Sequence, residues 1–371
     1  MKLQFQKESL LNGINIVFKA IASNTSMPIL KCILIDASTS EIKLTATDMD
    51  LGIETKIEGL ILEHGKIALD AKLLFEIIRK LPDSESSVII VSDNLFNTRI
   101  ECENALFTIQ GLDGEEFSYL PYIERDHYIC LSQLTLREAI RQTIFSIAPN
   151  DSNKMMSGEL LEVHDNILKI VSLDGHRISI HNILLRDRYE DQKVIVPGKT
   201  LSEISKILTG DNEKDVLIFF SKNHILFEFD DTVVISRLIE GEYFRIDHML
   251  SNDYETRVKV NKREFMDNID RAMILIRDTD RKPIILTIED SNVNMRVKSS
   301  FGMMNADVSA QKTGRDIMIA FNPKFLLDAL RVIDDEEVDL YMMNPKSPCF
   351  IRDEAGSYIY LVLPVNFIVE N

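Results

Sequence analysis

Apolar residues recur at intervals of three and four in six segments of the chain, spanning 7–20, 72–80, 137–147, 199–208, 262–272 and 324–332. This spacing puts the apolar side chains on one face of an α-helix, so the pattern predicts six amphipathic helices. In and directly beside three of the segments the stripes are Leu10, Ile14, Val17 and Ile21; Leu136, Ile140, Ile144 and Ile147; and Phe265, Ile269, Ala272 and Ile276. In the other three they are Leu73, Leu74 and Ile77; Leu201, Ile204 and Ile207; and Leu326, Leu327 and Leu330.

Stretches of alternating apolar and polar residues lie between the helices, for example EIKLTAT, LLEVHDNILKIVSL and IILTIEDSNVNMRV. Such alternation is typical of antiparallel strands with one buried face. The order of strands and helices recurs three times with a period of about 125 residues, an ordinary domain size. The sequence therefore predicts an α+β fold with three domains of one topology, at 1–125, 126–252 and 253–371. The joints fall near 124–127 and 251–255.

Composition narrows the class of protein. Apolar residues make up 45% of the 371 residues, which excludes a disordered chain. Its four cysteines, Cys32, Cys102, Cys130 and Cys349, lack metal-ligand spacing, so we expect reduced thiols in a cytoplasmic protein and no metal site. Neither a signal peptide nor a membrane span is expected, because the N-terminus lacks an apolar h-region and no run of 18 apolar residues occurs.

Positive charge is concentrated in the predicted helices. The six segments hold fourteen basic and eight acidic side chains, whereas the whole chain has a net charge of −17. Ordinary helix-surface chemistry is one explanation for the excess of basic residues in the helices, since Lys and Arg are good helix formers. Alternatively, if all six helices face one side, they would form a weakly positive surface. That surface would attract a DNA duplex through its phosphates without reading its sequence.

The stretch VSLDGHRISI places Asp174, His176 and Arg177 close together between two apolar runs. In the repeat alignment Asp174 falls opposite Asp48 of the first copy and near Ser299 of the third, which predicts a turn-capping role. His176 and Arg177 occur only in the second copy. A catalytic role would need a nucleophile or metal partner. No G-x-S-x-G, HExxH or Walker pattern is present, so we predict no catalytic or cofactor-binding residue. A hydrolase built around Asp174 and His176 remains an alternative.

Several stretches together resemble the bacterial sliding clamp, the beta subunit of the replicative DNA polymerase III. They are MPILKCILI with TATDMDLGIE, SGELLEV with VSLDGHRISI, KVIVPGKTLSEI, AFNPKFLLDAL and YIYLVLPV, and the match runs from Met1 to about Val365. The resemblance implies a head-to-tail homodimer that forms a closed ring with pseudo-sixfold symmetry. Helices line the central hole of the ring, and the ring encircles double-stranded DNA irrespective of its sequence. The ring is a non-enzymatic processivity factor without a cofactor, and an ATP-driven clamp loader opens it.

The resemblance also implies three sets of functional positions. Ring closure would use Phe107, Ile109, Ile274 and Leu275, for which local core packing is an equally good explanation. The residues that contact DNA would be Asn24, Lys72, Asn150, Lys154 and Lys199. Short peptides of the polymerase catalytic subunit, the clamp loader and other partners would bind Met156, Leu173, Gly175, His176, Arg177, Ile178, Phe244, His248, Met249, Asn322, Phe325, Lys346, Pro348, Leu361, Leu363, Pro364 and Val365. Each apolar member of this set is equally well explained as plain core.

The chain departs from the family at several of these positions. Relatives often have Pro at Phe244, Arg at His248, Tyr at Phe325 and Arg at Asn24. They usually stop where this chain continues as NFIVEN, so Phe367 and Ile368 are expected near the peptide pocket. The alternative to a clamp is an acidic three-repeat interaction scaffold that uses the same groove and does not encircle DNA.

Overall fold

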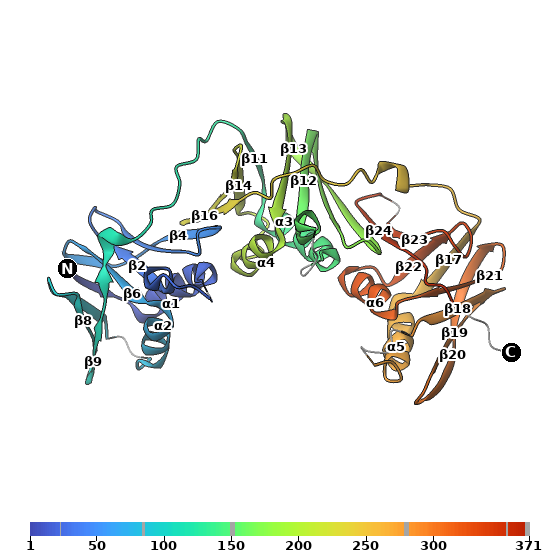
Figure 1. Ribbon diagram of the computed structural model, residues 1–371, viewed down its shortest axis with the longest axis horizontal. Helices are drawn as coiled ribbons and strands as arrows, with labels where there is room; N and C mark the ends of the chain where they lie inside the picture. The colour runs from blue at the N-terminus through green and yellow to red at the C-terminus, as the bar shows by residue number, and fades with distance from the viewer. Residues whose placement is uncertain (23, 84–85, 149–152, 278–281, 354, 368–371) are drawn as a thin grey trace. The chain divides into compact units, whose positions relative to one another are not determined.

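The protein, seen as a computed structural model, divides into two compact units. The structure describes residues 1–22, 24–83, 86–148, 153–277, 282–353 and 355–367. Unit 1 comprises Met1–Thr135 and Glu203–Leu238, and unit 2 comprises Leu136–Ser202 and Ile239–Asn371. Figure 1 labels the elements of both units.

The six predicted helices are all present. They are α1 (Lys7–Val17), α2 (Ala71–Lys80), α3 (Gln133–Thr143), α4 (Gly198–Ile207), α5 (Lys262–Met273) and α6 (Pro323–Val332). Side-chain caps explain where three of them begin. Asp70 accepts a hydrogen bond from the Leu73 amide, Asn261 from Glu264, and Asn322 from Lys324, at 2.8, 3.0 and 3.1 Å. Each cap satisfies a backbone N–H that the first helical turn leaves unpaired.

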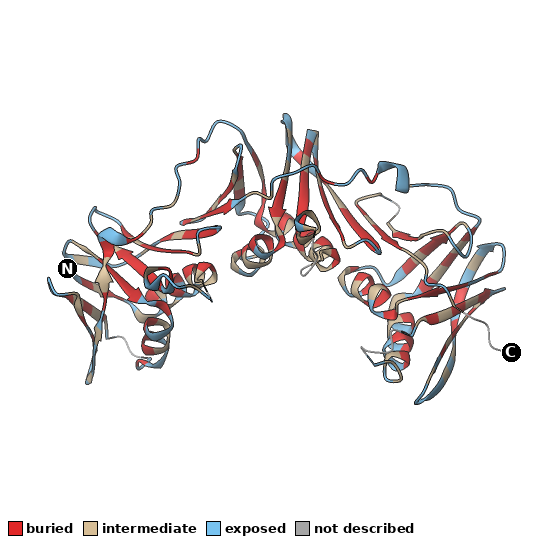
Figure 2. Ribbon diagram, in the orientation of Figure 1, coloured by how far each residue is buried: buried red, intermediate tan, exposed pale blue. Residues whose placement is uncertain are grey.

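Most of the predicted stripe residues are buried, and Figure 2 colours the helices by burial. Leu10, Ile14 and Val17 of α1 are fully covered, and so are Leu326 and Leu330 of α6. Leu73 in α2 is the one stripe residue that is exposed, at 46%. Consecutive helical residues point about 100° apart, and in α2 this turns Leu73 away from the buried side on which Leu74 lies.

Unit 1 holds two antiparallel sheets in its described part. The first has the strand order β5 (Leu60–Glu63), β1 (Lys2–Phe5), β7 (Val88–Ser92), β8 (Asn97–Cys102) and β9 (Ala105–Gln110). The second has the order β10 (Leu112–Asp113), β6 (Lys66–Asp70), β2 (Cys32–Asp36), β3 (Ile42–Thr47), β4 (Leu51–Ile57), β16 (Thr232–Arg237), β15 (His224–Phe229), β14 (Asp215–Phe220) and β11 (Tyr128–Ser132). The N-terminal half of the chain thus pairs with strands from beyond residue 200.

Unit 2 is built on one long antiparallel sheet. Its strand order is β12 (Gly158–Leu173), β13 (Arg177–Pro197), β24 (Tyr358–Val362), β23 (Cys349–Arg352), β22 (Glu337–Met342), β17 (Thr256–Asn261), β20 (Gly302–Gly314), β19 (Asn292–Ser299), β18 (Ile284–Glu289) and β21 (Ile317–Phe321). Helices α5 and α6 pack on the buried face of β17 to β24, where Phe265, Phe321 and Tyr360 are among the largest core side chains.

In each unit a sheet continues from one predicted domain into the next. Strand β4 pairs with β16 from Leu51↔Ser236 to Thr55↔Thr232, and β13 pairs with β24 from Arg177↔Val362 to His181↔Tyr358. The threonine pair adds a hydroxyl contact of 2.9 Å. The period-2 pattern predicts that these strands exist but gives no sign of which strands meet. Neighbouring predicted domains are thus connected by backbone hydrogen bonds between paired strands.

Candidate functional site

The loop between β12 and β13 is shaped by the carboxylate of Asp174. Its Oδ1 accepts hydrogen bonds from the backbone amides of His176 and Arg177, at 3.0 and 3.2 Å. Gly175 between them has φ +83°, a left-handed conformation that costs glycine nothing. The carboxylate thus holds a tight turn that projects His176 outward.

The first copy of the repeat has the same turn. Asp48 Oδ1 accepts from the amides of Asp50 and Leu51 at 3.1 and 2.8 Å, and Met49 has φ +79°. In the third copy Ser299 Oγ accepts from the amide of Phe301 at 3.1 Å. The prediction that Asp174 is first a turn-capping residue is confirmed.

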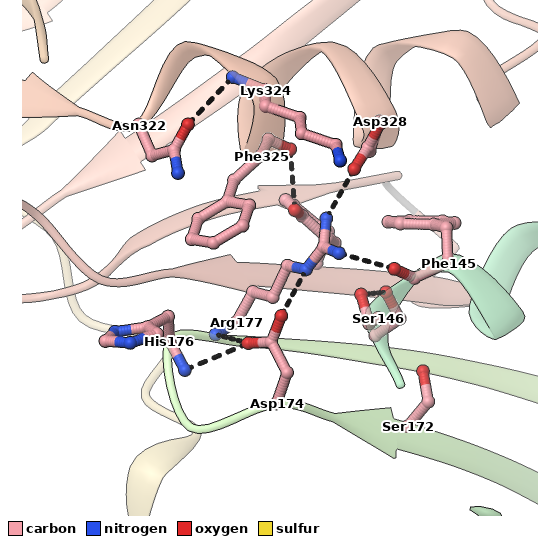
Figure 3. A network of polar contacts seen from close by, with 12 residues as sticks. Phe145, Ser146, Ser172, Asp174, His176, Arg177, Asn322, Lys324, Phe325 and Asp328 are labelled. Carbon is pink, nitrogen blue, oxygen red and sulfur yellow. Dashed lines mark hydrogen bonds and ion pairs between the residues drawn. The ribbon is translucent and has the colours of Figure 1, made fainter. Parts of the chain in front are cut away.

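Arg177 is held on all sides by groups of its own unit, as Figure 3 shows. Its Nε donates to Asp174 Oδ2 at 2.8 Å, Nη1 to Asp328 Oδ2 at 2.7 Å, and Nη2 to the carbonyl oxygen of Phe145 at 2.5 Å. The guanidinium also lies 4.5 Å from the ring centroid of Phe325. The side chain is only 8% exposed. This geometry favours a role in joining β13 to α6 over a role as donor to an incoming molecule.

His176 differs from Arg177 because its side chain is exposed. Its ring stacks on Phe325, with centroids 6.2 Å apart and an interplanar angle of 24°. Its backbone carbonyl accepts a hydrogen bond of 2.9 Å from the Leu363 amide. His176 and Phe325 together form an aromatic edge beside the start of α6.

The arrangement argues against a hydrolase at this loop. A catalytic carboxylate would orient the His176 ring, but the oxygens of Asp174 are engaged by two backbone amides and by Arg177. Among the described residues, no group of three or more His, Cys, Asp or Glu side chains is placed to hold a metal ion. Asp174 and Arg177 therefore support the loop structurally, and the exposed His176 side chain belongs to the protein surface.

We use the name 176 surface for the seventeen predicted peptide-binding positions, all of which lie in unit 2. Leu173, Ile178 and Leu361 belong to one buried cluster, against which Met156 and Leu363 pack. Phe244, Met249 and Val365 are each about 37% exposed, and His248 is exposed in the 3-10 turn η6 (Asp247–Met249). The surface therefore has a buried aliphatic base and an exposed apolar rim.

The remaining members of the 176 surface are loop and cap residues. Asn322 uses its side-chain oxygen to cap α6, while Lys346 and Pro348 lie in the turn between β22 and β23. That turn is held by Asn344, whose Oδ1 accepts from the amides of Lys346 and Ser347 at 2.9 and 3.0 Å. Pro364 lies between Leu363 and Val365, whose amides donate to His176 and Ala320.

The C-terminal residues leave the 176 surface, contrary to the expectation that they lie near it. The Val365 amide donates to the Ala320 carbonyl of β21 at 2.7 Å, and Phe367 lines a depression together with Ile285 and Met318 of the same sheet. Ile368 lies outside the described residues.

The predicted DNA-facing residues are exposed where the structure describes them. Asn24 follows α1, Lys72 is in α2, Lys154 is in the 3-10 turn η5 (Lys154–Ser157), and Lys199 is in α4. Asn150 lies outside the described residues. Several other helix cations are ion-paired, including Arg79 with Glu76, Arg141 with Glu138, Lys206 with Glu203, and Arg331 with Asp270.

The predicted ring-closing residues lie at exposed places in both units. Phe107 and Ile109 belong to β9, which is the last strand of its sheet in the described part of unit 1. Ile274, just after α5, is 80% exposed, whereas Leu275 packs partly against the core of unit 2. Core packing therefore does not explain Ile274.

Sequence reasoning missed two partners of Arg177. Asp328 lies in α6 among the apolar stripe residues, and Phe145 contributes its backbone carbonyl and its ring, whose centroid lies 5.6 Å from the guanidinium. An acidic residue beside a buried stripe is a weak signal for a buried ion pair, and a backbone carbonyl gives no signal at all.

Comparisons with known proteins cover the whole chain. The models for the N-terminal, central and C-terminal domains of the DNA polymerase III beta subunit match residues 1–121, 130–244 and 248–366. The beta sliding clamp of Staphylococcus epidermidis is 32% identical over 376 residues, covering 98% of this chain and 99% of the relative.

Solved structures give the same result. A putative DNA polymerase III beta subunit from Eubacterium rectale is 60% identical with a TM-score of 0.95, covering 99% of this chain and 100% of the other. The Bacillus subtilis DNA polymerase sliding clamp is 31% identical with a TM-score of 0.94 and the same coverage. With its three-domain clamp fold, the chain belongs to the DNA polymerase III beta subunit family, the beta sliding clamps.

Proposed function

We propose that two copies of this chain close head to tail into a ring that encircles double-stranded DNA and tethers the replicative polymerase to it. The ring is built from three domains per chain, at 1–125, 126–252 and 253–371, and it acts in the cytoplasm. Members of the family are non-catalytic processivity factors, so we assign no active site to this chain.

The observation that carries this proposal is an uncovered strand edge in each unit. In unit 1 no described strand pairs with the outer edge of β9. In unit 2 residues 302–309 of β20 pair with β19, and only 310–314 pair with β17, which leaves one side of 302–309 without a described strand. Exposed strand edges are ready to pair with another chain.

Apolar side chains beside these edges support the same pairing. Phe107 on β9 and Ile274 near β20 are exposed, although each would normally be covered by protein. A head-to-tail contact joins two different surfaces, so it forms a closed ring when the rotation between copies allows closure. We propose β9 of one protomer against residues 302–309 of its partner, with Phe107 and Ile109 facing Ile274 and Leu275.

Encirclement explains how a chain of charge −17 can hold DNA. A closed ring stays on a duplex without strong contacts, and exposed cations such as Lys72, Lys154 and Lys199 provide weak attraction to phosphates. Asn24 and Asn150 are proposed to lie beside them. Such contacts carry no sequence information, which suits a ring that slides.

The 176 surface is proposed as the docking place for short peptides of the polymerase catalytic subunit, the clamp loader and other partners. Its exposed rim of Phe244, Met249 and Val365 accepts apolar anchors, and Met side chains adapt to different partners. His176 is the exposed polar group at its edge. Arg177 supports the surface from below.

Retention on circular DNA tests the proposal. The protein is loaded onto a nicked circular plasmid with a bacterial clamp loader and ATP, and bound protein is separated by gel filtration. We expect the protein to elute with the circle and to be released once a restriction enzyme linearises it. Equal retention on circular and linear plasmid would mean contact binding, and no retention on either would favour a scaffold that does not encircle DNA.

A further inference from the structure

Unit 1 has a groove of about 680 Å³ at one end of the ladder between β4 and β16, two strands that Figure 1 labels. The ladder ends there with the pair Thr55↔Thr232, whose hydroxyl oxygens lie 2.9 Å apart. The lining residues come from 9–59 and 207–232, so the groove spans the joint between the first two predicted domains. Among the described lining residues there is no member of the 176 surface and no predicted DNA-facing or ring-closing residue.

One wall of the groove is helix α1, which lies close to β4 because position 13 is a glycine. A Cβ atom at Gly13 would lie 2.3 Å from Cγ2 of Ile57 on β4, which is far too close for two carbons that are not bonded. Glycine avoids this clash and lets the helix approach the strand. Ser9 of the same helix donates through Oγ to the Glu58 carbonyl at 3.4 Å. The helix and the end of the strand are thus held together, so the groove is already shaped in the free chain.

The rim of the groove is negatively charged. Glu41, Glu58, Asp230 and Asp231 line it, and Lys56 is the one cation among its described lining residues. All five residues are exposed. The Lys56 amide donates to the Asp231 carbonyl at 2.9 Å, which fixes the turn that carries Asp230 and Asp231.

Lysines on the neighbouring strands do not neutralise this rim. Lys56 pairs with Glu41 at 2.7 Å. The hydrogen bond to Glu41 raises the Lys56 pKa, and the charge of Asp231 adds to the effect, so two carboxylates share one lysine. Lys43 also acts on Glu41, but it is paired with Glu54 at 2.9 Å, outside the groove.

The other side of the groove brings one more lysine. Asp230 pairs with Lys214 at 3.1 Å and accepts a hydrogen bond from Nε2 of Gln133 at 3.2 Å. Four carboxylates of the groove thus share two lysines, Lys56 and Lys214. With both lysines counted in full, the rim keeps an excess of two negative charges.

The base of the groove is apolar. Ile16 of α1, Ile57 of β4 and Ile207 of α4 are half-buried there, and Phe229 is buried beside them. Lys and Arg side chains lay their methylene stems along apolar surface while their charged ends stay at a polar edge. A base of isoleucines below exposed carboxylates therefore suits basic side chains.

We propose that this groove, the acidic groove, binds a basic peptide segment of a partner protein in which Lys or Arg flanks an apolar side chain. The basic groups pair with Glu58 and Asp231, and the apolar side chain rests on Ile16, Ile57 and Ile207. Charge complementarity of this kind guides the encounter and fixes the register of the bound segment.

Other occupants fit the groove less well. In the described ranges no group of three or more His, Cys, Asp or Glu side chains is placed to hold a metal ion. DNA or RNA would bring phosphates against the carboxylates, and like charges in contact oppose association. A polyamine has the right charge but no apolar side chain for the base.

Methyl NMR of the full-length protein locates the binding. Isoleucine is labelled at its δ1 methyl group, and the blocked peptide acetyl-Lys-Arg-Val-Lys-Arg-amide is the probe. We expect the signals of Ile16, Ile57 and Ile207 to shift with added peptide, while Ile178 of the 176 surface and the exposed Ile274 of unit 2 stay unchanged. The same peptide with Glu in place of each basic residue should shift none of the five signals.

Two variants and a matched control test the assigned residues. Glu58→Lys together with Asp231→Lys should weaken peptide binding by about tenfold or more, because two attractions become repulsions. Ile16→Ala should weaken it by roughly threefold. The control, Glu116→Lys with Glu124→Lys, reverses two exposed carboxylates of unit 1 outside the groove, so it changes the net charge equally and should bind as the parent does.

Unchanged isoleucine signals away from the groove show that each variant is folded, and the variant reversed at Glu58 and Asp231 should remain on circular DNA. Equal affinity of this variant and its control, an absence of shifts at Ile57 and Ile207, or shifts confined to Ile178 would overturn the proposal. Spermidine that shifts Ile57 as strongly as the peptide does would assign the groove to a polyamine instead. None of these results bears on ring closure, which the plasmid experiment tests by itself.

Discussion

Arg177 of β13 and Asp328 of α6 are 151 positions apart in the chain, and their side chains meet at 2.7 Å in a nearly buried ion pair. Asp174 and the Phe145 carbonyl occupy other nitrogens of the same guanidinium. Removing Asp328 would leave Arg177 paired with Asp174 alone and would take away a hydrogen bond between two charged groups, which contributes up to about 3 kcal/mol. The pair therefore secures the junction on which the 176 surface stands.

We expect Asp328→Asn to destabilise this junction by about 3 kcal/mol. The local opening of β13 against β24 should then increase, so backbone amides near 177–181 should exchange with deuterium about a hundredfold faster. Hydrogen exchange with mass spectrometry measures this. The control Arg245→Met removes the exposed pair with Glu242 and should leave exchange unchanged. Unaltered protection in Asp328→Asn would show that the ion pair contributes nothing to the junction.

Replacing Ile274 and Leu275 together with Ala should give a monomer that circular DNA does not retain. The physical reason is the loss of apolar contact area at the proposed closure, about 25 cal/mol for each Å². Sedimentation velocity measures the oligomeric state. Leu184→Ala, an exposed leucine on β13, is the matched control and should leave the dimer intact. A dimer that survives the double substitution would remove both residues from the interface.

Replacing Lys72, Lys154 and Lys199 with Ala should lower loading onto DNA without disturbing the dimer. Each lysine that neutralises a phosphate adds about 0.9 to the slope of log affinity against log salt. The substitutions remove three lysines from each protomer of the proposed ring, so the slope should fall by up to about five. Loading measured between 50 and 200 mM salt gives this slope. Lys222→Ala, in the turn between β14 and β15, serves as control. If salt dependence is the same in both proteins, the three lysines do not face DNA.

Glu159 on β12 should make the protein less stable as pH rises. Its side chain is fully buried, Thr143 donates to Oε2 at 3.2 Å, and Oε1 has no partner among the described residues. Burial raises the pKa of this carboxyl to about 8. Below about pH 4.5 both folded and unfolded chains hold the proton. Between there and pH 8 only the folded chain keeps it, so stability is progressively lost.

Glu159→Gln should remove this loss, because the amide is neutral at every pH. We expect the variant to be more stable than the parent by at least about 2 kcal/mol at pH 9, and similar to it near pH 5. The melting temperature between pH 5 and pH 9 reports the difference. Glu162→Gln on the same strand, where the carboxylate pairs with Lys193 nearer the surface, is the control. A parent curve as flat as that of Glu159→Gln would contradict the raised pKa.

The sequence predicted what local pattern determines. Stripes such as Leu10, Ile14 and Val17 define helices through their spacing, and the threefold repeat identified Asp174 as a turn residue by its match to Asp48. Contacts between segments far apart in the chain could not be predicted from local pattern. The pairing of Thr55 with Thr232 and of Arg177 with Asp328 depends on which surfaces meet, and local propensity carries no information on that.

Phe367 illustrates the same difficulty at the candidate sites. Resemblance to relatives suggested a position near the 176 surface, since that is where the shared part of the chain ends. In the structure it lines a depression with Met318, and the hydrogen bond from the Val365 amide to the Ala320 carbonyl directs the chain toward it. A tail can follow either side of an edge strand, and the sequence does not favour one side.

The ladders of β4 with β16 and β13 with β24 have a mechanical consequence. Hydrogen bonds along a ladder share a sideways load, so bending a joint would require several of them to break at once. Each unit therefore resists bending where two of the predicted domains meet within it, and a load on one end of a unit is carried across the ladder to the other end.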